Sequence, residues 1–328
     1  MHRLCTGLCL AGAALAVAIT GIKSATAAVS CSISAITASY GSVDILSGAI
    51  DDTTGTFTVT CSGGSASQSI RLCLEMGAGA TALGPSNERV LRSASDYIDQ
   101  EFYFDAARTQ VWGAWGTTVT AYPVASPAGI QQDVTLNGSG NGTFNYTVYG
   151  RIFGSQQTKT PGSYTWTGSS PAVQYRATSG ATACPTGGST AASSGSTFSA
   201  TINSNANVST SGVNFGSVSF MTSNTDATGT VTVQATNTTP YNVGLGAGGG
   251  SGATVATRKM TNGANTVTYS LYSDVSRTTV WGNTIGSDTV TGTGSGNNQS
   301  LTVYGRAPVQ SSKPPGTYTD TVVVTVTY

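Results

Sequence analysis

Carboxylate and cysteine side chains are the groups of this chain best suited to chemistry, because histidine is almost absent. The single histidine, His2, lies in a segment that we expect to be removed. Its loss excludes a Ser-His-Asp or Cys-His nucleophile and a His-ligated zinc site. A carboxylate pair for glycoside hydrolysis stays open, with no spacing that favours it, among Asp96, Asp99, Glu101 and Asp105. We therefore expect no enzymatic activity and no cofactor.

Two other features could indicate a ligand, and an ordinary structural explanation is favoured for both. Asp51 and Asp52 are adjacent acids, but two carboxylates are far fewer ligands than a calcium loop supplies. Residues 244–252 are rich in glycine, yet they do not lead from a strand into a helix as a phosphate loop does. Charged residues make up only 9% of the sequence, and they form no basic stripe that would bind nucleic acid.

Residues 1–27 carry the pattern of a secretory signal. A weakly basic start at His2 and Arg3 precedes an apolar stretch over residues 8–19, and Ala25-Thr26-Ala27 matches an A-x-A cleavage site. The apolar stretch is shorter than the roughly 20 residues that span a membrane, and no later segment is apolar enough to do so. We expect an exported mature chain that begins at Ala28.

Cysteine usage agrees with export. After the signal leaves with its two cysteines, four remain in the chain: Cys31, Cys61, Cys73 and Cys184. In an exported chain this number predicts two disulfides, with three possible pairings. A redox pair is disfavoured, because no Cys-x-x-Cys motif and no nearby histidine is present.

The mature sequence is built twice, and the repeat indicates which residues belong to the framework. Three motifs recur in the same order: Val111-Trp112-Gly113 as Val280-Trp281-Gly282, Thr147-Val148-Tyr149-Gly150-Arg151 as Thr302-Val303-Tyr304-Gly305-Arg306, and Pro161-Gly162-Ser163-Tyr164 as Pro315-Gly316-Thr317-Tyr318. The two tryptophans are therefore expected in two cores. Asp105 and Arg108 recur as Asp274 and Arg277, which favours a structural turn over a site.

Both copies predict an all-β fold. Short segments rich in β-branched and aromatic residues alternate with Gly, Asn, Asp and Pro, and no helical period follows the signal. Two tandem β-sandwiches of about seven strands each are expected. Their bounds are a first domain over residues 28–184, a linker over 185–205 and a second domain over 206–328.

Two segments raise the question of strand pairing. Residues 197–202 alternate, so that Phe198, Ala200 and Ile202 share one face if extended. This segment either opens the second domain or completes the first one as a donor strand from the same chain. The β-branched run over residues 321–328 has no later strand to pair with, which predicts a domain that waits for a strand from another molecule.

Taken in order, the motifs resemble the spore coat protein U domain, the subunit fold of archaic chaperone–usher pili. The resemblance is also carried by Tyr40-Gly41, Phe215-Gly216, Arg258-Lys259-Met260 and Tyr269-Ser270-Leu271-Tyr272. It implies two immunoglobulin-like sandwiches, of which the second lacks its last strand. It also implies three partners: a periplasmic chaperone that lends a strand first, an outer-membrane usher, and an adjacent subunit whose strand then replaces that of the chaperone.

The resemblance further implies a place in the pilus. Single-domain subunits carry a donor extension before their first cysteine, whereas here Cys31 closely follows the cleavage site. A chain that accepts a strand and gives none is expected at the cell-surface pilus tip, secreted through the periplasm, as a tip adhesin. The expected strand-accepting and chaperone-contacting residues are Val322, Val324, Val326 and Tyr328.

One of the three disulfide pairings is favoured at this point. Cys31 and Cys61 bracket the opening hairpin-like unit, and the second copy loses both, because Ala206 and Ala235 align with them. Pairing those two cysteines leaves the other two for each other, which ties a central strand to the tail of the first domain.

An insertion in the first copy is the best candidate for function. The offset between the copies falls from 169 residues at Trp112 to 155 at Tyr149, so the first copy has about 14 extra residues. An uncharged apolar loop either packs on its own domain or contacts something else. We favour adhesion to a hydrophobic surface or host target, as the apolar finger loops of the resembling adhesins imply, through residues of this loop and a second one: Trp115, Tyr122, Pro123, Val124, Ile130, Leu83 and Pro85.

The expected function is therefore a pilus tip subunit that mediates adhesion to surfaces and biofilm formation. Two alternatives stay open. One is a duplicated structural pilin or spore-coat-like subunit without an adhesive role, and the other is a soluble carbohydrate-binding module.

Overall fold

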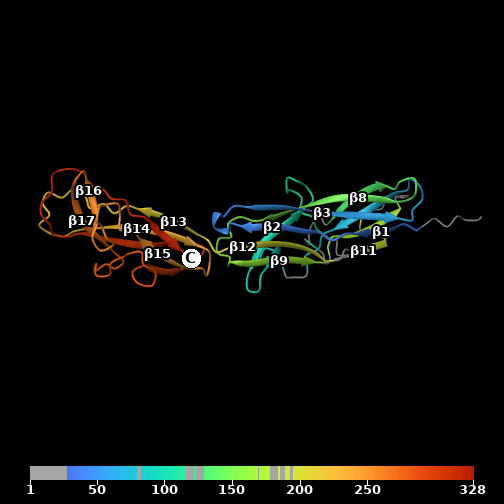
Figure 1. The fold of residues 1–328 in the computed structure, drawn as a ribbon. Coiled ribbons are helices and arrows are strands. Elements are labelled where there is room, and N and C mark those ends of the chain that lie inside the picture. The colour runs from blue at the N-terminus through green and yellow to red at the C-terminus, as the bar shows by residue number, and fades with distance from the viewer. Residues whose placement is uncertain are drawn as a thin grey trace, which may run out of the picture.

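The computed structural model describes residues 28–79, 83–114, 122, 129–168, 170–177, 184, 189–192 and 195–328. Residues 1–27, the expected signal, lie outside this part. Within it the regular structure is β-strand except for one 3-10 turn, η1 (Ile45–Ser47), and no helix is long and apolar enough to cross a membrane. The strands form two domains that lie end to end (Figure 1). The predicted all-β fold with two tandem domains is confirmed.

The first domain packs two sheets around one core. The larger sheet has the order β1 (Ser30–Ile33), β3 (Asp51–Ser62), β8 (Gly142–Ile152), β6 (Tyr97–Tyr103), β5 (Arg89–Arg92), β9 (Gly162–Gly168), β12 (Ser196–Ile202) and β2 (Thr37–Val43). The smaller sheet has the order β11 (Ser189–Ala192), β10 (Ala172–Ala177), β4 (Ser69–Glu75) and β7 (Ile130–Thr135). Pro171 separates β9 from β10, because proline has no N–H to continue the ladder.

The second domain repeats this plan with fewer strands. Its larger sheet has the order β13 (Ala206–Ser211), β14 (Thr225–Ala235), β19 (Gln299–Ala307), β17 (Asn265–Tyr272) and β16 (Arg258–Asn262). Its smaller sheet has the order β18 (Val290–Thr293), β15 (Pro240–Leu245) and β20 (Val324–Thr327). Its buried core contains 12 residues in the described part of the chain, against 29 in the first domain, so the second sandwich is much less filled.

The recurring tryptophans lie where the repeat predicts. Trp112 is fully buried, and its Nε1–H donates to the carbonyl oxygen of Leu74 at 3.1 Å. Trp281 is equally buried and donates to the carbonyl oxygen of Val243 at 2.8 Å. Each indole therefore fills one core and ties its polar edge to a strand of the smaller sheet, as buried tryptophans require.

The recurring acid closes a turn, as expected. The carboxylate of Asp274 accepts hydrogen bonds from the backbone N–H groups of Thr278 and Thr279 at 3.1 and 2.6 Å. Asp105 bonds in the same way to the N–H groups of the two equivalent residues. The prediction of a structural turn is confirmed in both domains.

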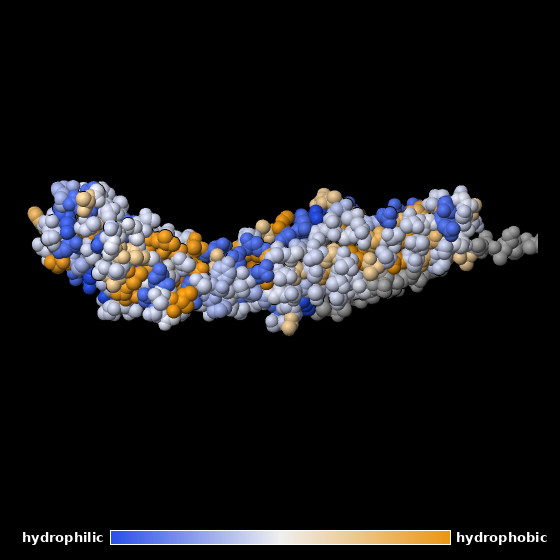
Figure 2. Space-filling view, in the orientation of Figure 1, coloured by the Kyte–Doolittle hydropathy of each residue, from blue (hydrophilic) through white to orange (hydrophobic). Residues whose placement is uncertain are grey.

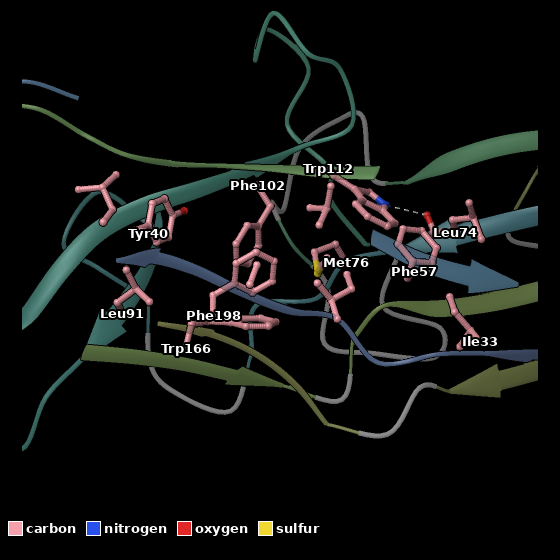
Figure 3. Close-up of a cluster of buried hydrophobic side chains, with 14 of the residues drawn as sticks. Ile33, Tyr40, Phe57, Leu74, Met76, Leu91, Phe102, Trp112, Trp166 and Phe198 are labelled. Atoms are coloured by element: carbon pink, nitrogen blue, oxygen red, sulfur yellow. Dashed lines mark hydrogen bonds between the residues drawn. The ribbon is translucent and has the colours of Figure 1, made fainter. Parts of the chain in front are cut away.

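β12 belongs to the first domain. It runs antiparallel to β9 and parallel to β2, and it lies between them. Phe198, Ala200 and Ile202 all point into the first core and are at most 2% exposed. Figure 3 shows Phe198 among the aromatic side chains at the centre of that core. Two roles were considered for residues 197–202. In the structure they complete the first domain as a strand from the same chain, and they do not open the second domain.

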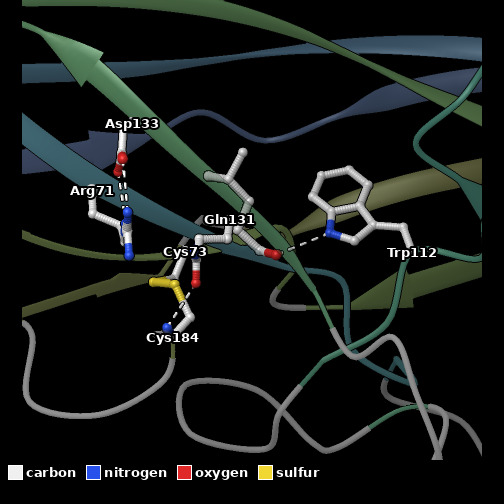
Figure 4. The surroundings of a disulfide bond; sticks show 7 residues. Arg71, Cys73, Trp112, Gln131, Asp133 and Cys184 are labelled. Carbon is white, nitrogen blue, oxygen red and sulfur yellow. Dashed lines mark hydrogen bonds and ion pairs between the residues drawn. A yellow bond between two sulfur atoms is a disulfide. The ribbon is translucent and has the colours of Figure 1, made fainter. Parts of the chain in front are cut away.

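Both favoured disulfides are present. Cys31 on β1 lies directly opposite Cys61 on β3 and is bonded to it. The alanines that replace them also lie opposite each other, Ala206 on β13 and Ala235 on β14. Figure 4 shows the second disulfide, Cys73 to Cys184, beside the hydrogen bond from the backbone N–H of Cys184 to Gln131.

Candidate functional site

The second domain contains a groove of about 860 Å³. Its two walls are residues 212–221, which follow β13, and residues 312–324, which lead into β20. Its floor is apolar and comes from the core strands: Val231, Leu245, Met260, Val267, Leu271 and Val303. Figure 2 shows the apolar surface of the second domain as large orange areas.

The two walls are the counterparts of β2 and β9. Phe215-Gly216 on one wall aligns with Tyr40-Gly41 of β2, and Gly316 with Tyr318 on the other aligns with Gly162 and Tyr164 of β9. In the first domain β12 pairs with both of these strands. In the described second domain no strand lies between the walls, and the wall that matches β2 forms no strand at all. The wall that matches β9 is bridged to β16 on its outer side through Thr319 and Thr261, and without a partner on the side of the groove neither wall forms a ladder there.

Large apolar side chains are exposed around the groove. Phe220 on the first wall is 71% exposed and Val218 is 42% exposed. Val208 on the edge strand β13 is 44% exposed, whereas Ile33, its counterpart on β1, is only 8% exposed. Exposed large apolar side chains beside an apolar groove are typical of an interaction site.

The C-terminal residues predicted to accept a strand divide into two groups. Val322 and Val324 line the groove, and Val326 packs against the same core beside them. β20 pairs with β15 along one edge, and the described residues provide no partner for its other edge. Tyr328 is 54% exposed, lies outside the groove and donates from its hydroxyl to Asn205 Oδ1 at 3.3 Å.

Two polar groups support the groove, and the sequence prediction included neither. The guanidinium of Arg258 is buried and donates to the carbonyl oxygens of Leu245, Gly246 and Trp281. Asp320 lines the groove and accepts a hydrogen bond from the Tyr269 hydroxyl at 2.7 Å. Burial, and then this carboxylate, raise the pKa of Tyr269, so the phenol stays protonated and keeps donating.

Arg89 has the same place in the first domain, with an added ion pair. It donates to the carbonyl oxygens of Met76, Gly77 and Trp112, and it also pairs with the buried carboxylate of Glu101. The 169-residue offset that relates Trp112 to Trp281 relates Arg89 to Arg258 as well, and this signal could have identified both arginines.

The assignment of Tyr122 to an adhesive surface was wrong. Its side chain is only 3% exposed, its hydroxyl donates to Glu101, and the Arg89 guanidinium lies 3.8 Å from its ring centre. Burial raises the pKa of its phenol. A large aromatic residue with a polar edge suits a buried, hydrogen-bonded position as well as a surface. Here Tyr122 is buried because it packs on Arg89 and donates to Glu101.

The other residues of the predicted adhesive set have different positions. Trp115, Pro123 and Val124 lie outside the described residues. Ile130 opens β7 and is half-buried against the first core. Leu83 is half-buried and Pro85 is exposed, so Pro85 alone among the described members is freely accessible.

Several of the acids considered for catalysis or metal binding form structural contacts. Asp96 accepts a hydrogen bond from the backbone N–H of Thr160, and Asp52 forms a bidentate ion pair with Arg151. The pKa of Asp99 is raised to about 6, first by burial and then by a hydrogen bond with Glu88. The described residues contain no group of three or more His, Cys, Asp or Glu that could hold a metal ion.

Comparisons with known proteins bear on the fold and the family. A family model described as the Spore Coat Protein U domain matches residues 15–167 and 190–325. "Protein U" of Myxococcus xanthus is 41% identical over 107 residues, which cover 31% of this chain and 59% of that protein. The chain therefore spans little more than half of this relative.

Two solved structures align with most of this chain. The CsuC–CsuE complex of chaperone and tip adhesion subunit, from archaic Csu pili of Acinetobacter baumannii, aligns with a TM-score of 0.52 and 16% identity. That alignment covers 91% of this chain and 100% of the other, and it shows a shared fold. The CupB6 tip adhesin from Pseudomonas aeruginosa aligns with a TM-score of 0.38 and 10% identity over 92% of this chain and 94% of the other.

Proposed function

Because the chain belongs to the spore coat protein U domain family, we propose that it is a chaperone–usher pilus subunit whose second domain is completed by a strand from another polypeptide. The observation that carries this proposal is the open groove of the second domain, at the position that β12 fills in the first. An added strand binds through main-chain hydrogen bonds and fits alternate side chains into pockets. The unpaired backbone groups on the groove side of the walls can form these hydrogen bonds, and the apolar floor can accommodate the side chains.

The proposal gives the groove two successive occupants. The first is a strand of a periplasmic chaperone, which protects the apolar floor until the subunit reaches an outer-membrane usher. The second is a donor strand of the adjacent subunit. The fold similarity to a tip subunit crystallised with its chaperone supports this order. Val322 and Val324 contact either occupant, because they line the groove.

For the first domain we propose adhesion at the pilus tip, on the cell surface, with biofilm formation as its consequence. The domain carries its own completing strand, so it needs no partner and can face outward. The proposed contact with a hydrophobic surface or host target rests on the exposed Pro85 with the half-buried Leu83 beside it and on the inserted residues Trp115, Pro123 and Val124. A large apolar side chain contributes roughly 1.5–3 kcal/mol when buried, and many tips add avidity.

The burial of Tyr122 favours a second candidate, a structural subunit without an adhesive role, because it removes one member of the adhesive set. Immunogold labelling of cells that produce the protein separates the two. Label at fibre ends supports the tip adhesin, and label along whole fibres supports the structural subunit. Label that never lies on a fibre would contradict the pilus assignment itself.

A further inference from the structure

The first domain provides a template for the strand that fills the groove of the second. β12 runs antiparallel to β9 and parallel to β2, and every second residue of it points inward. In the repeat, the wall at residues 316–322 corresponds to β9 and the wall at 213–218 corresponds to β2. An occupant that follows this template presents four inward side chains: one at the level of Ser196, whose hydroxyl accepts from the N–H of Ile36, and three apolar ones at the levels of Phe198, Ala200 and Ile202.

Two of the three levels have the same walls in both domains. Ala200 lies opposite Gly41 and Tyr164, and Ile202 lies opposite Val43 and Gly162. The second domain keeps each of these residue types: Gly216 and Tyr318 at the first level, Val218 and Gly316 at the second. A small residue followed by an aliphatic one therefore fits there too.

The third level differs between the domains. In the first, Phe198 lies opposite Trp166 and its ring centre is 4.2 Å from that of Phe102. The counterparts of these two aromatic residues are Asp320 and Leu271, both of which line the groove. The second domain thus lacks one indole and one benzyl group at this level, and the space that they would fill is open.

The glycines beside this level confirm that Asp320 replaces Trp166. Gly79 has a φ of +99°, and a Cβ added to it would collide with the Trp166 ring. Gly248 lies 169 residues later with a φ of +83°, and a Cβ there would collide with the Asp320 carboxylate. Each glycine therefore leaves space for the side chain that faces it, Trp166 in the first domain and Asp320 in the second.

Asp320 has room for one more donor. Oδ2 accepts from Tyr269, and Oδ1 accepts from the backbone N–H groups of Gly249 and Thr321. A carboxylate offers about four acceptor positions, so these three bonds leave one free. An apolar strand laid over this carboxylate would remove its water without replacing that bond, which is costly.

We propose that the groove selects a strand whose last three inward side chains are, from its N-terminal to its C-terminal end, a tryptophan or tyrosine, a small residue and an aliphatic one. The aromatic ring fills the open level, and its N–H or O–H donates to Asp320. This inference rests on the proposed function, since it assumes that the groove accepts a strand.

Peptide binding to the full exported chain tests the inference. The probes are three peptides that copy residues 189–202, with Trp, Phe or Ala at the position of Phe198. We expect the Trp peptide to bind about tenfold more tightly than the Phe peptide, since a hydrogen bond to a charged group contributes that much, and the Ala peptide to bind most weakly. The variant Asp320→Trp carries the residue found at this position in the first domain. In this variant the Phe peptide should bind more tightly than the Trp peptide.

The outcomes distinguish the inference from the function on which it rests. If none of the peptides binds, both the groove as a strand acceptor and its selectivity are contradicted. If the Phe or Ala peptide binds as tightly as the Trp peptide, the selectivity alone is contradicted. Asp226→Asn, outside the groove lining, is the control and should keep the wild-type order. If Asp320→Trp does not fold, the ranking on the wild-type chain decides.

Discussion

The ring centre of Phe198 lies 4.2 Å from that of Phe102, which brings the last strand of the first domain to the middle of its core. The two residues come from β12 and β6, and both are fully buried. The first domain is therefore completed by its own chain, and the second domain has an open groove where this contact would be.

Truncation of this ring should destabilise the first domain. Phe198→Ala is expected to lower its free energy of unfolding by about 3–5 kcal/mol, because a buried phenylalanine leaves a large cavity. Thr201→Ala, on the exposed side of the same strand, should change it by no more than about 0.5 kcal/mol. Denaturant unfolding measures both, and equal effects would show that β12 does not belong to the core.

Removal of the whole strand should be more severe. A chain of residues 28–205 is expected to fold alone, because it retains β12 beside β9 and β2. A chain of residues 28–184 lacks that strand and should stay unfolded or aggregate. Circular dichroism and proteolysis compare them, and a well-folded shorter chain would contradict completion by β12.

The second domain should accept the disulfide that it lacks. Ala206 and Ala235 lie directly opposite each other on β13 and β14, in the register of the Cys31–Cys61 bond. The double variant Ala206→Cys/Ala235→Cys is expected to form a disulfide and to stabilise this domain by about 2–4 kcal/mol. Thiol titration and thermal unfolding provide the check, and two free thiols in the folded oxidised protein would contradict the register.

The pH dependence of the first domain should include a contribution from Asp99. Its pKa in the folded protein is raised to about 6, first by burial and then by the Glu88 hydrogen bond, against the opposing charge of Lys159. The folded state thus favours the protonated form, and this contribution to stability is lost as the pH rises from about 4 to about 6. Asp99→Asn should remove this loss and melt above the wild type at pH 7.

Asp133→Asn is the matched control for this experiment. The Arg71 hydrogen bond lowers the pKa of Asp133, so this carboxylate is already ionised across the same range. Its variant should keep the wild-type slope between pH 4 and 6 in thermal unfolding. A slope that survives in Asp99→Asn would show that another group is responsible.

The repeat made much of this architecture predictable. Trp112 and Trp281 were expected in the cores because one motif recurs in one order, and Ala206 opposite Ala235 followed from alignment with the first cysteine pair. Tyr122 was misplaced, because an uncharged apolar segment has the same composition whether it is buried or exposed. What buries Tyr122 is the Arg89–Glu101 pair on β5 and β6, and a single sequence does not reveal that pairing.

The groove was predictable in kind but not in detail. The β-branched run that contains Val322 and Val324 predicted a domain that accepts a strand, whereas the opposite wall with Phe220 follows no strand pattern and was missed. Asp320 was also missed, because its role in the groove depends on its position against Gly248, a residue far away in the sequence. Such contacts between distant segments are set by the fold and not by local pattern.

Hydrogen exchange on the purified exported chain, with no partner bound, tests the central claim most directly. The account predicts slow exchange through β1 to β12 and fast exchange along both walls of the groove, at residues 212–221 and 312–324, with protection of the walls once a groove-filling peptide is added. Equal and strong protection of both domains in the free monomer, unchanged by peptide, would contradict it.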